Sequence, residues 1–189
     1  VMDSGKEHLG SEIVQTGKCL LELLQKNLCP DFVRAPEEIA LAAPWDEADY
    51  RVGIYLYDIQ DYSICRTQES AINESLRRLP PKAVELSYLV FCNEKHRFGG
   101  LQREQLHAVL NEVIRTIYDN PVLTRENGEE VGISFLRESA EFKIRLWGSF
   151  HQALWPAVYV RVMPVLLTSR RLRKVHAVQE RDYRADPMQ

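Results

Sequence analysis

Two long segments of the chain place an apolar residue at every second position. They cover residues 50–59 and 83–92, and both are rich in β-branched and aromatic side chains. A period of two is typical of a β-strand, so we predict two strands with large side chains on both faces. Such faces are covered by helices or by another subunit. The residues that share one face are Val52, Ile54 and Leu56 in the first segment, and Val84, Leu86, Tyr88 and Val90 in the second.

Shorter segments predict three further strands. Residues 37–43 lie between two prolines and indicate an edge strand, because proline cannot donate a ladder hydrogen bond. Residues 131–136 alternate after the turn signal Asn127-Gly128. Residues 157–167 alternate too, as the last strand of the chain. Pro164 places this strand at an edge or produces a bulge near its end, and we expect it to lie close to an edge.

Three segments have the spacing of helices. They cover residues 11–28, with Ser11 as the expected cap, and residues 102–119 and 141–150. Pro30 and Asn120-Pro121 stop the first two. The apolar stripes consist of Ile13, Gly17, Leu20, Leu21, Leu24 and Leu28; of Leu106, Val109, Leu110, Val113, Ile114, Ile117 and Tyr118; and of Phe142, Leu146, Trp147 and Phe150.

Polar segments separate these elements and define the expected domain organisation. We expect a flexible N-terminus over residues 1–10, one folded domain over 11–168, and a basic and polar C-terminal arm over 169–189. We interpret residues 60–78 as a loop with one turn of helix at most. This loop and the arm are expected to become ordered on assembly.

The order of elements predicts the fold class. Strands that follow one another without an intervening helix argue against a doubly wound parallel sheet. We therefore predict an α+β fold in a single domain, with a mixed, mainly antiparallel β-sheet flanked by helices that pack on one side. A chain of 189 residues is long enough for one such domain with a substantial core.

Composition and charge exclude several classes of function. The net charge of −3 and a pI near 6.0 argue against a general nucleic-acid binder, which needs a basic face. No apolar run approaches the roughly 20 residues that a membrane span needs. The first eight residues are polar and do not resemble a signal peptide, so we expect the chain to fold in the cytoplasm.

The sequence contains no recognisable catalytic, metal or cofactor motif. The four cysteines form no Cys-x-x-Cys pair, and no two of the five histidines have the spacing of metal ligands on one helix. Gly99-Gly100 lacks the Lys-Ser/Thr of a phosphate loop. We expect His107 at the boundary of the core or at the surface, Trp147 in the core, and Asp58 as a local acceptor at a strand end. No enzymatic activity, metal or cofactor is therefore predicted.

Candidate contact residues lie near the C-terminal end. Arg170, Arg171, Arg173 and Lys174 place four cations in the six residues 169–174. They are either a solvated face or a docking arm for an acidic partner surface, and nucleic acid is the weaker alternative because few aromatic residues interleave with them. Trp155 precedes a proline outside the helical pattern and is a candidate for apolar contact with a partner.

The order of several short motifs resembles a known family over roughly residues 10 to 168. It is similar to the cap, or tail-terminator, family of phage-tail-like contractile injection systems, such as the Photorhabdus virulence cassettes and the antifeeding prophage. The motifs are Tyr55-Leu56-Tyr57-Asp58-Ile59, Arg66, Pro81, Leu86-Ser87-Tyr88-Leu89, Asn120-Pro121-Val122-Leu123, Leu146-Trp147 and Tyr159-Val160-Arg161-Val162.

The resemblance implies a structural protein. Members of this family form a six-fold ring that closes the end of the inner tube and contacts the last sheath ring, which stops growth. The implied partners are copies of the chain itself, the inner tube protein and the sheath protein. The resemblance also implies assembly in the bacterial cytoplasm and a final place within a contractile particle. Two alternatives stay open: a monomeric or dimeric adaptor or chaperone for a tail component or cargo, and an enzyme with an unrecognised site.

Overall fold

A six-stranded sheet forms the centre of the protein. The computed structural model describes residues 12–62, 69–73, 76–93 and 103–174. The strand order is β1-β2-β5-β8-β7-β6, and all neighbours are antiparallel except β1 and β2, which are parallel. The mixed, mainly antiparallel sheet predicted from the sequence is confirmed. The strands are β1 (Ile39–Leu41), β2 (Val52–Asp61), β5 (Lys82–Cys92), β6 (Val122–Thr124), β7 (Glu130–Phe135) and β8 (Ala157–Leu167).

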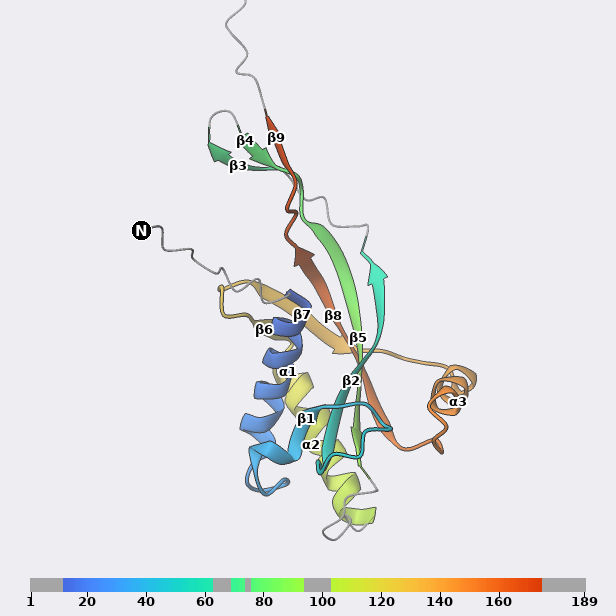
Figure 1. The fold of residues 1–189 in the computed structure, drawn as a ribbon. Helices are drawn as coiled ribbons and strands as arrows, with labels where there is room; N and C mark the ends of the chain where they lie inside the picture. Colours follow the sequence, from blue (N-terminus) through green and yellow to red (C-terminus); the bar gives the residue numbers. More distant parts are fainter. Residues whose placement is uncertain (1–11, 63–68, 74–75, 94–102, 175–189) are drawn as a thin grey trace, which may run out of the picture.

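A second, three-stranded sheet stands beyond one end of the first (Figure 1). Its strands are β3 (Ser70–Asn73), β4 (Leu76–Arg78) and β9 (Leu172–Lys174), in the order β3-β4-β9. Residues 60–78 were predicted as a loop, and this was wrong, because β2 extends to Asp61 and two strands follow. Short strands that cover no core lack the apolar alternation on which the prediction depended.

The chain forms the small sheet where β5 and β8 continue past the large one. Lys82 pairs with Leu167, the Leu79 N–H donates to the Arg171 carbonyl at 3.1 Å, and Arg78 pairs with Leu172. Pro80 and Pro81 lie between these contacts and have no backbone N–H, so the ladder is interrupted there. The prediction that 157–167 is the last strand was therefore wrong. Parts of both segments that were expected to become ordered on assembly are strands in the single chain, namely β3, β4 and β9.

Helices cover both faces of the large sheet. The helices α1 (Glu12–Leu28) and α2 (Arg103–Asp119) pack on one face, and α3 (Ala140–Ser149) lies on the other (Figure 1). All three helices were predicted, but the placement of every helix on one side was wrong. Successive residues of β5 point to opposite faces, and both faces carry large side chains, so each face needs a cover.

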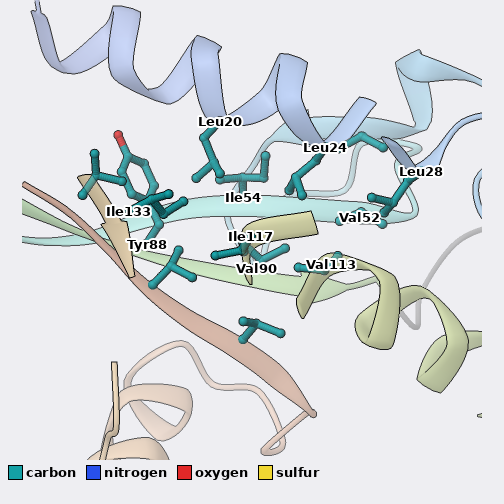
Figure 2. Packing of buried hydrophobic residues seen from close by; sticks show 14 of the residues in the cluster. Leu20, Leu24, Leu28, Val52, Ile54, Tyr88, Val90, Val113, Ile117 and Ile133 are labelled. Carbon is teal, nitrogen blue, oxygen red and sulfur yellow. The ribbon is translucent and has the colours of Figure 1, made fainter. Parts of the chain in front are cut away.

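The larger core lies between the sheet and the helices α1 and α2. Leu20, Leu24 and Leu28 of α1 are fully buried against Val52 and Ile54 of β2. Figure 2 shows these side chains packed with Tyr88 and Val90 of β5 and with Val113 and Ile117 of α2. The apolar faces predicted for β2 and β5 are thus confirmed. Ile114 and Tyr118 are the exceptions on α2, because they lie outside the stripe that the sheet covers and are 47% and 76% exposed.

An aromatic cluster fills the opposite face. Trp147 of α3 is fully buried, and its Nε1–H donates a hydrogen bond to the hydroxyl of Tyr159 at 3.0 Å. Phe91 of β5 contacts Trp147 edge to face, with the ring centroids 6.0 Å apart. Tyr159 and Phe91 alternate with residues of the larger core, so β5 and β8 contribute to both. The core position predicted for Trp147 is confirmed.

Pro164 lies at a bulge in β8. Val84 pairs with Val165 and Leu86 with Val162, so β8 has one residue more than β5 in this interval. The pairing of β7 with β8 ends next to it, at Gly132 and Met163. The predicted bulge is therefore confirmed. As a whole β8 is not an edge strand, because β7 pairs with its residues 160–163, but the described residues after Met163 pair with β5 alone. The edge strand predicted over residues 37–43 is confirmed as β1, which is shorter.

Gly53 marks the tightest packing between β2 and the aromatic cluster. A Cβ atom there would contact the Phe91 ring, with Cε1 at 2.6 Å, and would lie 2.9 Å from Cε2 of Tyr50. Both rings are buried and cannot retract. We therefore predict that Gly53→Ala lowers the free energy of unfolding by about 1–3 kcal/mol in urea denaturation.

Gly148→Ala is the matched control. No atom lies within 4 Å of a Cβ atom at this position in α3. Alanine favours the helix over glycine, so this substitution should be neutral or stabilise by about 1 kcal/mol. Equal destabilisation by the two substitutions would contradict the close packing assigned to Gly53.

Candidate interaction surfaces

The small sheet gathers cations from two distant segments. Arg77 and Arg78 lie in β4, Arg173 and Lys174 lie in β9, and Arg170 and Arg171 directly precede β9. We call the residues 69–73, 76–78 and 170–174 the basic sheet. Glu69 is the one acidic residue among them, and it lies 3.8 Å from Arg173. The four cations singled out from the sequence are thus joined by two more.

Two of these cations face each other across the ladder. Arg77 of β4 pairs directly with Arg173 of β9. Opposite residues of an antiparallel pair have their side chains on the same face, and like charges in that arrangement destabilise a sheet. An acidic surface placed against this face would relieve the repulsion.

Sequence reasoning missed Arg77 and Arg78 because the surrounding segment had been interpreted as a loop. The adjacent arginines before Pro80-Pro81 were the available signal.

An apolar groove lies along the edge of the large sheet. It occupies about 390 Å³ between α1 and the strands β1 and β2. Val14 and Leu41 contribute to it and are 49% and 45% exposed. Gly17 leaves the wall of α1 open, since a Cβ atom there would reach contact distance of Leu41 and Tyr88. We call this the β1 groove, and its lining includes Ile13, Val14, Gly17, Leu41, Tyr55 and Leu56.

The chain beside the β1 groove is acidic. Residues 37–49 contain five carboxylates and no lysine or arginine, and we call them the acidic segment. Asp46 lines the groove, and its Oδ2 accepts a hydrogen bond from the Ala43 N–H at 2.7 Å. Glu38 pairs with Arg51 at 2.8 Å, whereas Glu37 and Glu47 are exposed. An apolar groove with an acidic border is suited to a basic partner with exposed apolar side chains.

A second groove contains Trp155. It occupies about 410 Å³ where α2 and α3 approach the start of β8, and its lining includes Leu110, Ile114, Lys143, Leu154 and Pro156. Ile114 and Leu154 are 47% and 51% exposed. The Trp155 ring is half-buried, with its centroid 5.4 Å from that of Trp147. Trp155 therefore belongs to the aromatic cluster on one side and borders the groove on the other.

Tyr50 and Asp58 have local structural roles. The Tyr50 hydroxyl donates to the Ala43 carbonyl at 2.8 Å, and burial together with the charge of Asp46 raises the pKa of Tyr50 to about 12. Asp58 accepts hydrogen bonds from the Ile59 N–H and from Gln60, which confirms its local role. His107 is exposed, as predicted. No group of three His, Cys, Asp or Glu that could hold a metal was found in the described part of the chain.

Three cysteines lie in the described part of the chain. Cys92 is buried, and Cys19 and Cys29 are half-buried. Burial raises the pKa of both half-buried thiols, which lowers their reactivity.

Four predictions fall outside the described residues: the flexible N-terminus with its Ser11 cap, Cys65, Gly99-Gly100, and the arm beyond Lys174. None of the described helices has the length and apolar character of a membrane span.

Comparisons with known proteins place this geometry in a family. The family model described as the Pvc16 N-terminal domain matches residues 15–180. A solved structure of the sheath/tube terminator of the extracellular contractile injection system PVC, in its extended state, has a TM-score of 0.65 and 19% identity. The cap of the anti-feeding prophage, a tube-terminating cap, has a TM-score of 0.62 and 20% identity. No curated protein sequence matches the chain.

The two solved structures cover nearly the whole of this chain. The matches include 94% and 91% of its residues, but 65% and 61% of the solved chains, so this chain spans less than two thirds of each. At such identities the likeness establishes the fold. It confirms the α+β class and the resemblance to tail terminators that the motifs predicted.

Glu12 ties the start of α1 to the base of the basic sheet, which leads to a pH-dependent prediction. Its Oε1 accepts a hydrogen bond from the Thr168 N–H at 2.9 Å. Burial raises the pKa of Glu12, but hydrogen bonds with Thr168 and the charge of Arg125 hold it below the model-compound value of 4.5. The ionised carboxylate therefore stabilises the fold above pH 4.5, and this contribution is lost as the pH falls through the folded-state pKa.

We predict that Glu12→Gln lowers the urea midpoint at pH 7 and that its difference from the unsubstituted chain shrinks below pH 4.5. The measurement is urea denaturation of both chains across pH 3–7. Glu130→Gln, at an exposed position, serves as the control. A difference for Glu12→Gln that does not change with pH would contradict the assignment.

Proposed function

The chain belongs to the Pvc16 N-terminal domain family, and on this premise we propose that it caps a contractile injection particle. In this role it sits on the last ring of the inner tube and sheath and stops their growth. The observation that carries the proposal is the match of nearly the whole chain to two solved proteins, one a sheath/tube terminator and the other a tube-terminating cap. Neither match is to an enzyme, and we propose a structural role without catalysis.

A cap that closes a tube must contact several partners at once, and the surfaces of this chain suit that requirement. The basic sheet, the β1 groove and the Trp155 groove lie on different parts of the fold and differ in chemical character. Copies of the chain arranged as a ring, with six as the number that the resemblance implies, would use one pair of surfaces. Tube and sheath proteins would use the others. Exposed apolar side chains in contiguous grooves support such contacts.

We propose different contributions to docking for the contact residues predicted from the sequence. Arg170, Arg171, Arg173 and Lys174 are exposed and suit electrostatic docking to an acidic surface. Trp155 contributes the part of its ring that borders the groove, while the remainder stabilises the aromatic cluster. A Trp155→Ala substitution would therefore affect folding as well as contact, so the cations are the cleaner test of docking.

We propose that the chain folds and joins the particle in the bacterial cytoplasm. Its final place is then within the particle, whether extracellular or cell-associated. The adaptor or chaperone alternative differs in one observable property, because an adaptor leaves when assembly is complete and a cap remains at the end.

The test is assembly of particles with and without the chain. With it, particles should have one narrow length distribution in electron micrographs, and the chain should co-purify with them. Without it, tubes and sheaths should vary in length, because nothing stops the addition of subunits. A chain bearing Arg103→Glu and Arg137→Glu, two reversals at exposed positions outside the surfaces named above, should restore uniform length.

Identical length distributions with and without the chain would contradict the capping role. A chain that binds a component during assembly and is absent from finished particles would favour the adaptor.

A further inference from the structure

We propose that the basic sheet of one copy docks onto the β1 groove and acidic segment of the next copy. The inference rests on the proposed cap function and identifies the contact that builds its ring. The two surfaces differ from each other, so each copy offers one to each neighbour. Such a head-to-tail contact closes into a ring when the rotation between copies divides the circle.

The basic sheet has the composition of a docking element. Among its described residues, six cations accompany the single carboxylate of Glu69. Arg77 and Arg173 repel each other across the ladder, so this face favours an anionic neighbour. Ile72 and Leu172 are 47% and 51% exposed on strands that cover no core. The sheet therefore presents positive charge together with apolar contact area.

The β1 groove has the complementary composition. Its exposed apolar side chains are Val14 and Leu41, in a hollow of about 390 Å³ that can receive the apolar side chains of the basic sheet. The acidic segment borders the hollow with Asp46 and continues with the exposed Glu47. Opposite charges around an apolar centre fix the orientation of two partners and accelerate their encounter.

The two surfaces cannot meet within one chain. Figure 1 shows the basic sheet beyond one end of the large sheet, at the top of the view, whereas β1 lies in the lower half beside α1. The β5–β8 ladder holds these regions apart. Their complementarity can be used only between copies. The structure itself contains an acidic and apolar surface, namely the β1 groove with the acidic segment. A second copy of the chain is therefore favoured as the partner over an acidic surface of the tube or sheath.

Nucleic acid is the weaker occupant of the basic sheet. Its described residues include no aromatic side chain on which a base could stack.

The experiment reverses charge on each surface separately. The basic-sheet variant carries Arg171→Glu and Lys174→Glu, which leaves the contact between Arg173 and Glu69 in place. The acidic-segment variant carries Glu37→Lys and Glu47→Lys. All four positions are exposed, so each variant should unfold at the same urea concentration as the original chain. Self-association is measured by analytical ultracentrifugation over a concentration series. The control is Arg103→Glu plus Arg137→Glu, which has the same change in net charge as the basic-sheet variant.

Each variant alone should self-associate about tenfold more weakly or worse, while the control associates normally. A mixture of the two variants should recover, because each acidic surface then meets a basic one. A chain with all four reversals should recover by itself for the same reason. This reciprocal rescue is the result that a general loss of charge would not produce.

Three results would overturn the proposal: a chain that stays monomeric at every concentration, an oligomer that neither variant weakens, or weakened variants that do not rescue each other. A basic-sheet variant that associates normally but no longer limits particle length would also overturn it. That outcome would assign the sheet to the tube or sheath and leave the cap function intact. If the unsubstituted chain itself did not limit particle length, that result would instead contradict the cap function.

Discussion

The antiparallel pairing of β5 with β8 is the constraint on which the rest of the structure depends. Each strand is eleven residues long, and their side chains alternate between two separate cores. Phe91 and Tyr159 hold α3 on one face, whereas Tyr88, Val90 and Val160 hold α1 and α2 on the other. Because both strands continue past the large sheet, the same pairing also positions β4 and β9. Register in this ladder therefore determines both the core and the placement of the basic sheet.

The interaction surfaces lie where helices no longer cover the sheet that the β5–β8 ladder organises. Past Pro80 and Pro81, no helix packs on the described residues of the small sheet, and many of these residues are basic. At the β1 edge of the large sheet, this three-residue strand ends beside α1 and leaves the β1 groove open. Exposed apolar positions remain at these places because the helices are too few to cover them. A protein that works within an assembly has partners to complete such surfaces.

The sequence predicted the elements that pack against a core, because burial of one face gives their apolar residues a regular spacing. Val52, Ile54 and Leu56 revealed β2, and the spacing of Leu20, Leu24 and Leu28 revealed α1, because each set faces one core. The prediction failed for β3, β4 and β9, which cover no core and therefore lack apolar alternation. These strands were interpreted as loop and tail. The prediction also placed β8 close to an edge, because Pro164 fits an edge or a bulge equally well without knowledge of the β6–β7 hairpin. For the candidate site, charge identified Arg170, Arg171, Arg173 and Lys174, but only pairing brought Arg77 and Arg78 beside them.

The central claim is that this fold works by shape at the end of a tube. Its most direct test is electron microscopy of finished particles that contain the chain with an antibody or gold label. The account predicts one cluster of label at a single end of each particle, in a fixed number of copies. Label distributed along the tube, at random positions, or absent from finished particles would contradict it.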